Sequence, residues 1–216
     1  HDARATARFW ESLGFAMPAA DACVVSLFAY ENPAITRLIA DWMASPLPVV
    51  AAVPVGLPPD LACRAMGEPS PSPGSTLRRG ALELRVLPFL PQRRYDELLW
   101  SCHCNFVRGE DSFVRAQWAG LPFVWQAYPQ ADEAHAAKID AFLSLYGSNL
   151  PAEQGATLGR YWRGWNGITG QNGPKWQDFV QMLPVLTSLA RDWAVRLADL
   201  GDLASNLADF CRGKLK

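Results

Sequence analysis

The sequence predicts an α/β fold in which a doubly wound parallel sheet is followed by a helical carboxyl-terminal extension. Short apolar runs alternate with helical patterns up to about residue 126 of the 216-residue chain, and this alternation is typical of a doubly wound sheet. The runs are apolar almost throughout, as parallel strands covered on both faces are. Beyond residue 130 the pattern is helical only. In such a fold, ligands bind at the carboxyl ends of the strands.

The first 66 residues predict helix, strand, helix, strand and helix in turn. A short apolar stripe ended by a glycine indicates a helix over 5–13, and an uninterrupted apolar run indicates the first strand over 23–30. A proline suits the first turn of the next helix, 33–44, whose apolar residues share one face. The second strand, 48–55, is again apolar, and a short helix is expected over 59–66.

The middle of the chain begins with a stretch rich in Pro, Ser and Gly, 67–79, which we predict to be a mobile loop. The third strand, 82–89, follows it, and then a helix over 91–100 with a proline at its start. Within 105–118 a short apolar run leads into a glycine turn and then a helical pattern. The fifth strand occupies 121–125.

The rest of the chain predicts helices alone. Their apolar residues recur at helical spacing, and Gly-rich or Pro-containing stretches separate them. We expect these helices over 133–146, 152–164, 176–197 and 203–211.

Composition narrows the class of protein. Half of the residues are hydrophobic and the mean hydropathy is −0.03, so the chain can bury a sizeable core. A net charge of −1 and a pI near 6.3 argue against a nucleic-acid-binding surface. No apolar run approaches the roughly 18 residues that span a membrane. We therefore expect neither a nucleic-acid nor a membrane partner, and a cytoplasmic location.

The cysteine residues do not predict a disulfide scaffold. There are five, an odd number, and several lie in apolar runs, which favours a reducing compartment. Cys102, His103 and Cys104 are spaced closely enough to suggest zinc. On a strand, however, His103 would face away from the two cysteines, and no second ligand pair has suitable spacing. We expect no metal.

The glycine turn carries the strongest candidate for a binding site. Glu110, Asp111 and Ser112 suit the first turn of a helix, where free N–H groups and the positive dipole end favour such side chains. Nucleotide phosphates also bind at such strand–helix junctions, and Arg108 and Arg115 could supply positive charge for a diphosphate. The alternative is a capped helix whose Asp111 and Arg115 form a solvated i,i+4 pair.

Polar and aromatic residues follow the other strands at the same predicted edge. Phe28 and Tyr30 follow the first strand, and Phe89 and Gln92 follow the third. Rings to stack a base, an amide to read its edge, carboxylates for hydroxyls and arginines for phosphate suit a nucleotide diphosphate. Taken singly, aromatic residues such as these are more often core residues. Neither a dinucleotide-binding glycine motif nor a P-loop occurs, so those classes of site are disfavoured.

The block from Asn105 to Trp118 contains the run Arg-Gly-Glu-Asp-Ser and is the most specific segment of the chain. It resembles a segment of a known family, the bacterial protein-arginine rhamnosyltransferases that modify translation elongation factor P (the EarP family). Further similar segments occur in the family's order, and the resemblance runs from about residue 9 to the carboxyl terminus. These further segments are 26–32, 89–92, 120–125 and 128–130.

The resemblance implies the carboxyl-terminal half of a GT-B glycosyltransferase, an architecture of two Rossmann-like domains that face a cleft. Enzymes of this family transfer rhamnose from dTDP-β-L-rhamnose, with inversion, to an arginine side chain of the elongation factor, and no cofactor or metal is expected. The donor nucleotide binds in the carboxyl-terminal domain. By match to the family's motif, the residues around thymine and nearby donor groups would be Phe28, Tyr30, Phe89, Gln92 and Tyr95.

The glycine turn would hold the rest of the donor. The resemblance implies that Asp111 accepts a hydrogen bond from the deoxyribose hydroxyl, and that Arg108, Glu110 and Ser112 hold the diphosphate and the sugar. Glu110 is also the one candidate here for a part in catalysis.

The family's amino-terminal domain supplies the acceptor-side catalytic aspartate and most contacts with the elongation factor, and its segments are not found here. The first residue is not Met, so we expect a piece of a longer protein that binds donor but does not transfer rhamnose alone. Alternatives are the donor-binding half of a UDP-sugar GT-B enzyme and a non-catalytic nucleotide-sugar-binding module. We expect a linker with its helix over 1–20, the nucleotide-sugar-binding domain over 21–175 and carboxyl-terminal helices over 176–216.

Overall fold

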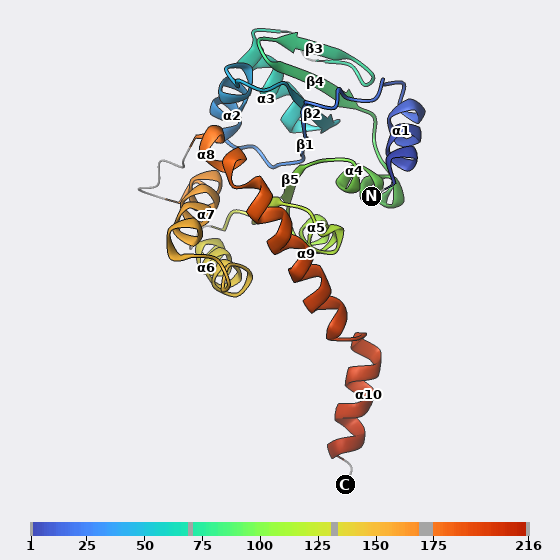
Figure 1. Ribbon diagram of the computed structural model, residues 1–216, viewed down its shortest axis with the longest axis vertical. Helices are drawn as coiled ribbons and strands as arrows, with labels where there is room; N and C mark the ends of the chain where they lie inside the picture. The colour runs from blue at the N-terminus through green and yellow to red at the C-terminus, as the bar shows by residue number, and fades with distance from the viewer. Residues whose placement is uncertain (1, 69–70, 131–133, 169–174, 215–216) are drawn as a thin grey trace.

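The computed structural model describes residues 2–68, 71–130, 134–168 and 175–214, and its centre is a six-stranded sheet in the order β3-β4-β2-β1-β5-β6 (Figure 1). All neighbouring strands pair in parallel except β3 and β4, which are antiparallel. The predicted α/β fold is therefore confirmed. The strands are β1 (Cys23–Leu27), β2 (Val49–Pro54), β3 (Thr76–Arg79), β4 (Leu82–Leu87), β5 (Cys104–Arg108) and β6 (Phe123–Gln126).

Helices cover both faces of the sheet, because successive side chains of each strand point to opposite faces. On β2, Val49 and Ala51 join the core beneath α2 (Ala34–Met43) and α3 (Leu57–Met66). Val50 and Ala52 join the other core, with Trp10 of α1 (Ala3–Ser12) and with α4 (Gln92–Trp100). The fifth helix of the alternating part, α5 (Asp111–Ala119), packs beside α4. This two-sided burial explains why the strands are apolar throughout.

The carboxyl-terminal helices extend the core beyond β6. Phe142 of α6 (Ala134–Tyr146) stacks on Trp162 of α7 (Ala152–Trp165), with ring centroids 5.7 Å apart. The indole N–H of Trp193 donates to Gln117 of α5 at 2.9 Å and ties α9 to the sheet layer. Figure 1 shows α10 extending away from the rest of the molecule, and no residue of α10 is buried. The last three helices are α8 (Trp176–Gln181), α9 (Leu183–Asp199) and α10 (Leu203–Lys214).

Two sequence predictions were wrong. The loop expected over 67–79 contains β3, whose antiparallel pairing makes the sheet mixed rather than wholly parallel. Three of its four residues are polar and exposed, which suits an edge strand with one unpaired side. The helix expected over 176–197 is two helices, separated at Met182 and with Pro184 in the first turn of the second.

The remaining element boundaries differ by a few residues. The first and third strands end earlier than expected, at Leu27 and Leu87, so Phe28, Tyr30 and Phe89 belong to loops. The start expected for the sixth helix, Glu133, lies outside the described residues, and α6 is described from Ala134. In the described part of the chain, no helix is both long and apolar enough to cross a membrane.

Candidate nucleotide-sugar site

A pocket of about 550 Å³ opens at the carboxyl ends of the central strands. The chain crosses from β4 on one side of β1 to β5 on the other, so the loops after these strands diverge and leave a crevice. All nine predicted substrate-binding residues line this pocket. The full lining is Phe28, Tyr30, Pro54, Val55, Phe89, Leu90, Gln92, Tyr95, Arg108, Gly109, Glu110, Asp111 and Ser112.

The loop after β1 is fixed by hydrogen bonds to the strands beside it. The backbone N–H of Phe28 donates to the carbonyl of Phe106 at 3.0 Å. The N–H of Tyr30 donates to the side-chain oxygen of Gln126 at 2.9 Å, and Gln126 is itself buried. Both aromatic side chains are therefore held at the pocket by backbone that has little freedom to shift.

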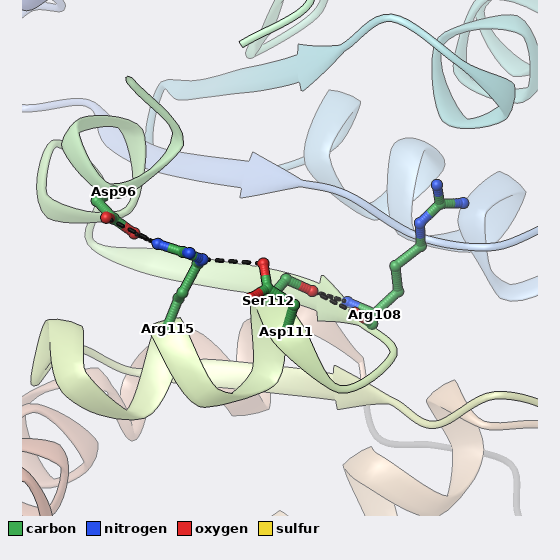
Figure 2. A network of polar contacts seen from close by, with 5 residues as sticks. All are labelled: Asp96, Arg108, Asp111, Ser112 and Arg115. Atoms are coloured by element: carbon green, nitrogen blue, oxygen red, sulfur yellow. Dashed lines mark hydrogen bonds and ion pairs between the residues drawn. The ribbon is translucent and has the colours of Figure 1, made fainter. Parts of the chain in front are cut away.

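The turn after β5 is closed by a serine. The Ser112 hydroxyl donates to the Arg108 carbonyl and accepts from the Arg108 N–H at 3.1 Å (Figure 2). Ser112 is buried, so this hydroxyl is used within the turn, although the residue lines the pocket. Gly109 allows the turn because its φ is +61°, a conformation that side-chain-bearing residues rarely adopt. Its carbonyl accepts from the Trp125 indole at 2.8 Å.

Arg108 lies across the aromatic residues of the pocket. Its guanidinium carbon is 4.3 Å from the ring centroid of Phe28 and 4.7 Å from that of Tyr30. The same group donates to the Ala29 carbonyl at 3.3 Å. Burial raises the pKa of the Tyr30 hydroxyl, and the Arg108 charge opposes that rise. The ring of Tyr95 meets that of Phe28 edge-on at 5.6 Å, so cation and rings form one group.

Acidic side chains and free backbone amides meet at the start of α5. Glu110 is the N-cap residue, but its side chain makes no capping hydrogen bond. The first N–H groups of a helix have no intrahelical acceptor, and they carry the positive end of the helix dipole. Asp111 accepts from Arg115, which also binds Asp96 of α4 (Figure 2). The turn therefore offers donors from its backbone and acceptors from its side chains.

The opposite wall comes from the segment between β4 and α4. Phe89 is 80% exposed at the rim, and Gln92 at the start of α4 is exposed as well. Tyr95 lies one turn further along α4, and burial raises the pKa of its hydroxyl well above the ordinary value. The rim is thus open, and the floor is closed and aromatic.

Four lining residues were not predicted: Pro54, Val55, Leu90 and Gly109. Pro54 ends β2 and Val55 follows it at the same sheet edge. The tendency of ligands to bind at the carboxyl ends of parallel strands could therefore have identified both residues. Gly109 is the glycine of the turn that the sequence singled out, whereas Leu90 only flanks Phe89 and has no separate sequence signal.

Two larger hollows lie away from the carboxyl ends of the strands. One, of about 730 Å³, lies between α1 and α4, and the other, of about 720 Å³, lies near the amino ends of the strands. His103 borders the second, where its Nδ1 accepts from the Val24 N–H at 2.9 Å. Within the described ranges, no group of three or more His, Cys, Asp or Glu residues is placed to hold a metal ion. The expectation of no metal stays a prediction.

Comparison with known proteins matches nearly the whole chain. A family model described as Elongation-Factor P (EF-P) rhamnosyltransferase EarP matches residues 1–212. A protein-arginine rhamnosyltransferase of Pseudomonas putida is 42% identical over 194 residues, which cover 90% of this chain and 51% of the relative. One of Pseudomonas aeruginosa is 41% identical over 187 residues, which cover 87% of this chain and 50% of the relative. The chain thus spans about half the length of these curated relatives.

A solved structure is similar as well. That structure carries the description "Structural basis for EarP-mediated arginine glycosylation of translation elongation factor EF-P". The similarity has a TM-score of 0.87 at 38% sequence identity, and it covers 99% of this chain and 67% of that one.

Proposed function

We propose, since this chain belongs to the EarP family of elongation-factor-P rhamnosyltransferases, that its pocket binds the sugar donor dTDP-β-L-rhamnose. We further propose that the whole protein transfers rhamnose to an arginine side chain of elongation factor P. One observation carries the proposal: all nine predicted residues line one pocket. This pocket lies at the carboxyl end of β1, where the chain crosses from one side of the sheet to the other.

The pocket offers a partner for each part of the donor. Phe28, Tyr30 and Tyr95 supply aromatic surface for thymine, with Phe89 and Gln92 at the rim. The exposed Asp111 carboxylate accepts from the deoxyribose hydroxyl. The free amides at the start of α5 and the Arg108 guanidinium hold the diphosphate, which a helix amino terminus favours by its dipole.

The same contacts would assist the reaction. An arginine nitrogen attacks the anomeric carbon, the bond from that carbon to the diphosphate oxygen breaks, and dTDP leaves with the added negative charge. Arg108 and the α5 amides stabilise this charge. The attacking guanidinium must also lose a proton, which requires a base because a guanidinium stays protonated at neutral pH. Glu110, the N-cap residue of α5, lines the pocket and is our candidate for assisting at this centre.

The first test is calorimetric titration of the 216-residue chain with dTDP-rhamnose, dTDP, UDP and GDP, repeated on Asp111→Ala. We expect saturable binding of both dTDP ligands and weak or absent binding of UDP and GDP. A charge-assisted hydrogen bond contributes about 1.5–3 kcal/mol, so Asp111→Ala should bind dTDP at least about tenfold more weakly.

The other outcomes separate the alternatives. Preference for UDP would indicate a different nucleotide-sugar enzyme, and nucleotide binding by the whole protein without transfer would indicate a binding module. A folded chain that binds no nucleotide would contradict the proposal. We also propose that the chain alone does not transfer rhamnose, so turnover by the purified chain would contradict that part.

A further inference from the structure

The start of α5 and the side of α4 are joined by one arginine. Arg115 lies one turn beyond Asp111, and its Nε donates to Asp111 Oδ2 at 2.9 Å. Its Nη1 donates to both carboxylate oxygens of Asp96, each at 2.9 Å. Figure 2 shows the guanidinium between the two carboxylates, with Asp96 on one helix and Asp111 on the other.

Two side chains of this network are partly buried, and the third is exposed to solvent. The side chains of Arg115 and Asp96 are 24% and 26% exposed, whereas that of Asp111 is 68% exposed. The guanidinium is a rigid planar fork, so two carboxylates bound at different edges fix its orientation. A carboxylate at the surface would otherwise sample several rotamers, and ordering it on ligand binding would cost affinity.

The two oxygens of Asp111 are used differently. Oδ2 accepts from Arg115, whereas Oδ1 has no hydrogen-bond partner among the described residues. One oxygen thus fixes the side chain and the other stays available at the pocket that Asp111 lines. Two carboxylates and one guanidinium leave the network with a charge of −1. That charge favours a hydroxyl donor over a phosphate at this end, while Arg108 supplies positive charge at the other end.

An ordinary i,i+4 pair would not need Asp96. Asp96 comes from a different helix and directly follows Tyr95, and Tyr95 and Gln92 line the opposite wall of the pocket. The network therefore fixes the distance between two pocket walls as well as one side chain. We propose that Arg115 and Asp96 are positioning residues that hold Asp111 Oδ1 toward a hydroxyl of the nucleoside. This inference rests on the proposed function, because it assigns that hydroxyl to the donor.

The test compares dTDP with its 3′-deoxy analogue, which lacks the hydroxyl. The measured quantity is the ratio of the two dissociation constants, which cancels general effects of a variant on folding or on the base and phosphate contacts. We expect the unaltered chain to bind dTDP about tenfold or more tightly than the analogue. Asp111→Ala should bind the two ligands equally.

The positioning variants keep the Asp111 carboxylate. Arg115→Met should lower the preference for the hydroxyl by roughly threefold or more, because the carboxylate is present but no longer oriented. Asp96→Asn leaves the Asp111–Arg115 pair in place and should also lower the preference, since the arginine loses the ion pair with Asp96 and one of its two acceptor oxygens. Arg163→Met is the matched control, because it breaks a similar pair with Asp140 outside the pocket and should keep the full preference.

Each outcome decides between the two proposals. An unchanged ratio in both Arg115→Met and Asp96→Asn, with dTDP still bound, would overturn the positioning role and leave the proposed function standing. An unaltered chain that binds dTDP and the analogue equally would also overturn it, since no hydroxyl contact would exist to position. A folded chain that binds neither ligand would instead overturn the proposed function.

Discussion

Gly109 shows how one residue can serve both the backbone and the pocket. Its φ of +61° closes the turn after β5, and a Cβ placed there would lie 2.7 Å from the Tyr30 hydroxyl oxygen. The position therefore excludes side chains for two separate reasons, strain and contact. Only the second reason concerns the ligand site.

A pair of glycine variants separates these reasons. Gly109→Ala should lower the free energy of unfolding by about 1–3 kcal/mol through its backbone strain, and should also weaken dTDP binding because Tyr30 must move. Gly14→Ala has a similar φ of +79° with nothing within 4 Å, so it should lose stability but keep binding. Thermal unfolding and calorimetric titration measure the two effects. Equal binding by both variants would show that Tyr30 need not stay where it is.

The residues of the pocket were predictable for a simple reason. Parallel strands place their carboxyl ends at one edge, so the residues that follow each strand must meet there. The same reasoning could not find Asp96, because its contact with Arg115 depends on how α4 and α5 lie against each other. It also could not show that the Ser112 hydroxyl is used within the turn, since that depends on the turn's backbone geometry.

At the scale of the elements, His103 extends the pairing of β1 with β5. Its ring Nδ1 accepts from the Val24 N–H at 2.9 Å, and the backbone N–H of His103 donates to the Val24 carbonyl at 2.7 Å. A protonated imidazole cannot accept at Nδ1, and burial accordingly lowers the pKa of His103 below its ordinary value.

The lowered pKa of His103 makes the stability of the folded chain depend on pH. The unfolded chain takes up the proton near pH 6.5 and the folded chain only at lower pH, so the stabilisation is present above about pH 6.5 and is lost as the pH falls below it. His103→Asn keeps an acceptor for the Val24 N–H but does not titrate. Thermal unfolding between pH 7.5 and 5 should therefore show a smaller loss of stability in the variant. Superimposable profiles would refute a contribution from His103.

The elements missed from the sequence were those that tertiary contacts define. β3 is short and polar, and only its pairing with β4 distinguishes it from a loop. The helix expected over 176–197 keeps its helical spacing through Met182, so periodicity alone could not show the break there. The buried strands, in contrast, were predictable because two covered faces require apolar residues at every position.

At the scale of the whole molecule, the five cysteine residues report on which parts are covered. Cys63, Cys102 and Cys104 are buried, Cys23 is partly covered and Cys211 is exposed on α10. Burial raises the pKa of Cys23 and of Cys63 to about 11, which removes the reactive thiolate at neutral pH.

Thiol labelling should therefore separate one cysteine from the rest. The folded chain at pH 8 should show one rapidly modified thiol, and Cys211→Ser should show none, whereas the unfolded chain should show all five. Intact mass against time measures this directly. Any fast thiol in the folded Cys211→Ser variant would mean that part of the sheet opens on the labelling timescale.

The strand order has a thermodynamic consequence. β1 lies between the wing formed by β2, β3 and β4 and the wing formed by β5 and β6, and the pocket takes residues from the ends of both wings. A ligand that touches both wings binds only the assembled sheet, so by linkage its binding free energy adds to the stability of the whole, about 2.7 kcal/mol at a hundred times Kd. No residue of α10 lines the pocket, so ligand binding does not stabilise this helix. Occupancy would thus stabilise the sheet without stabilising the projecting helix.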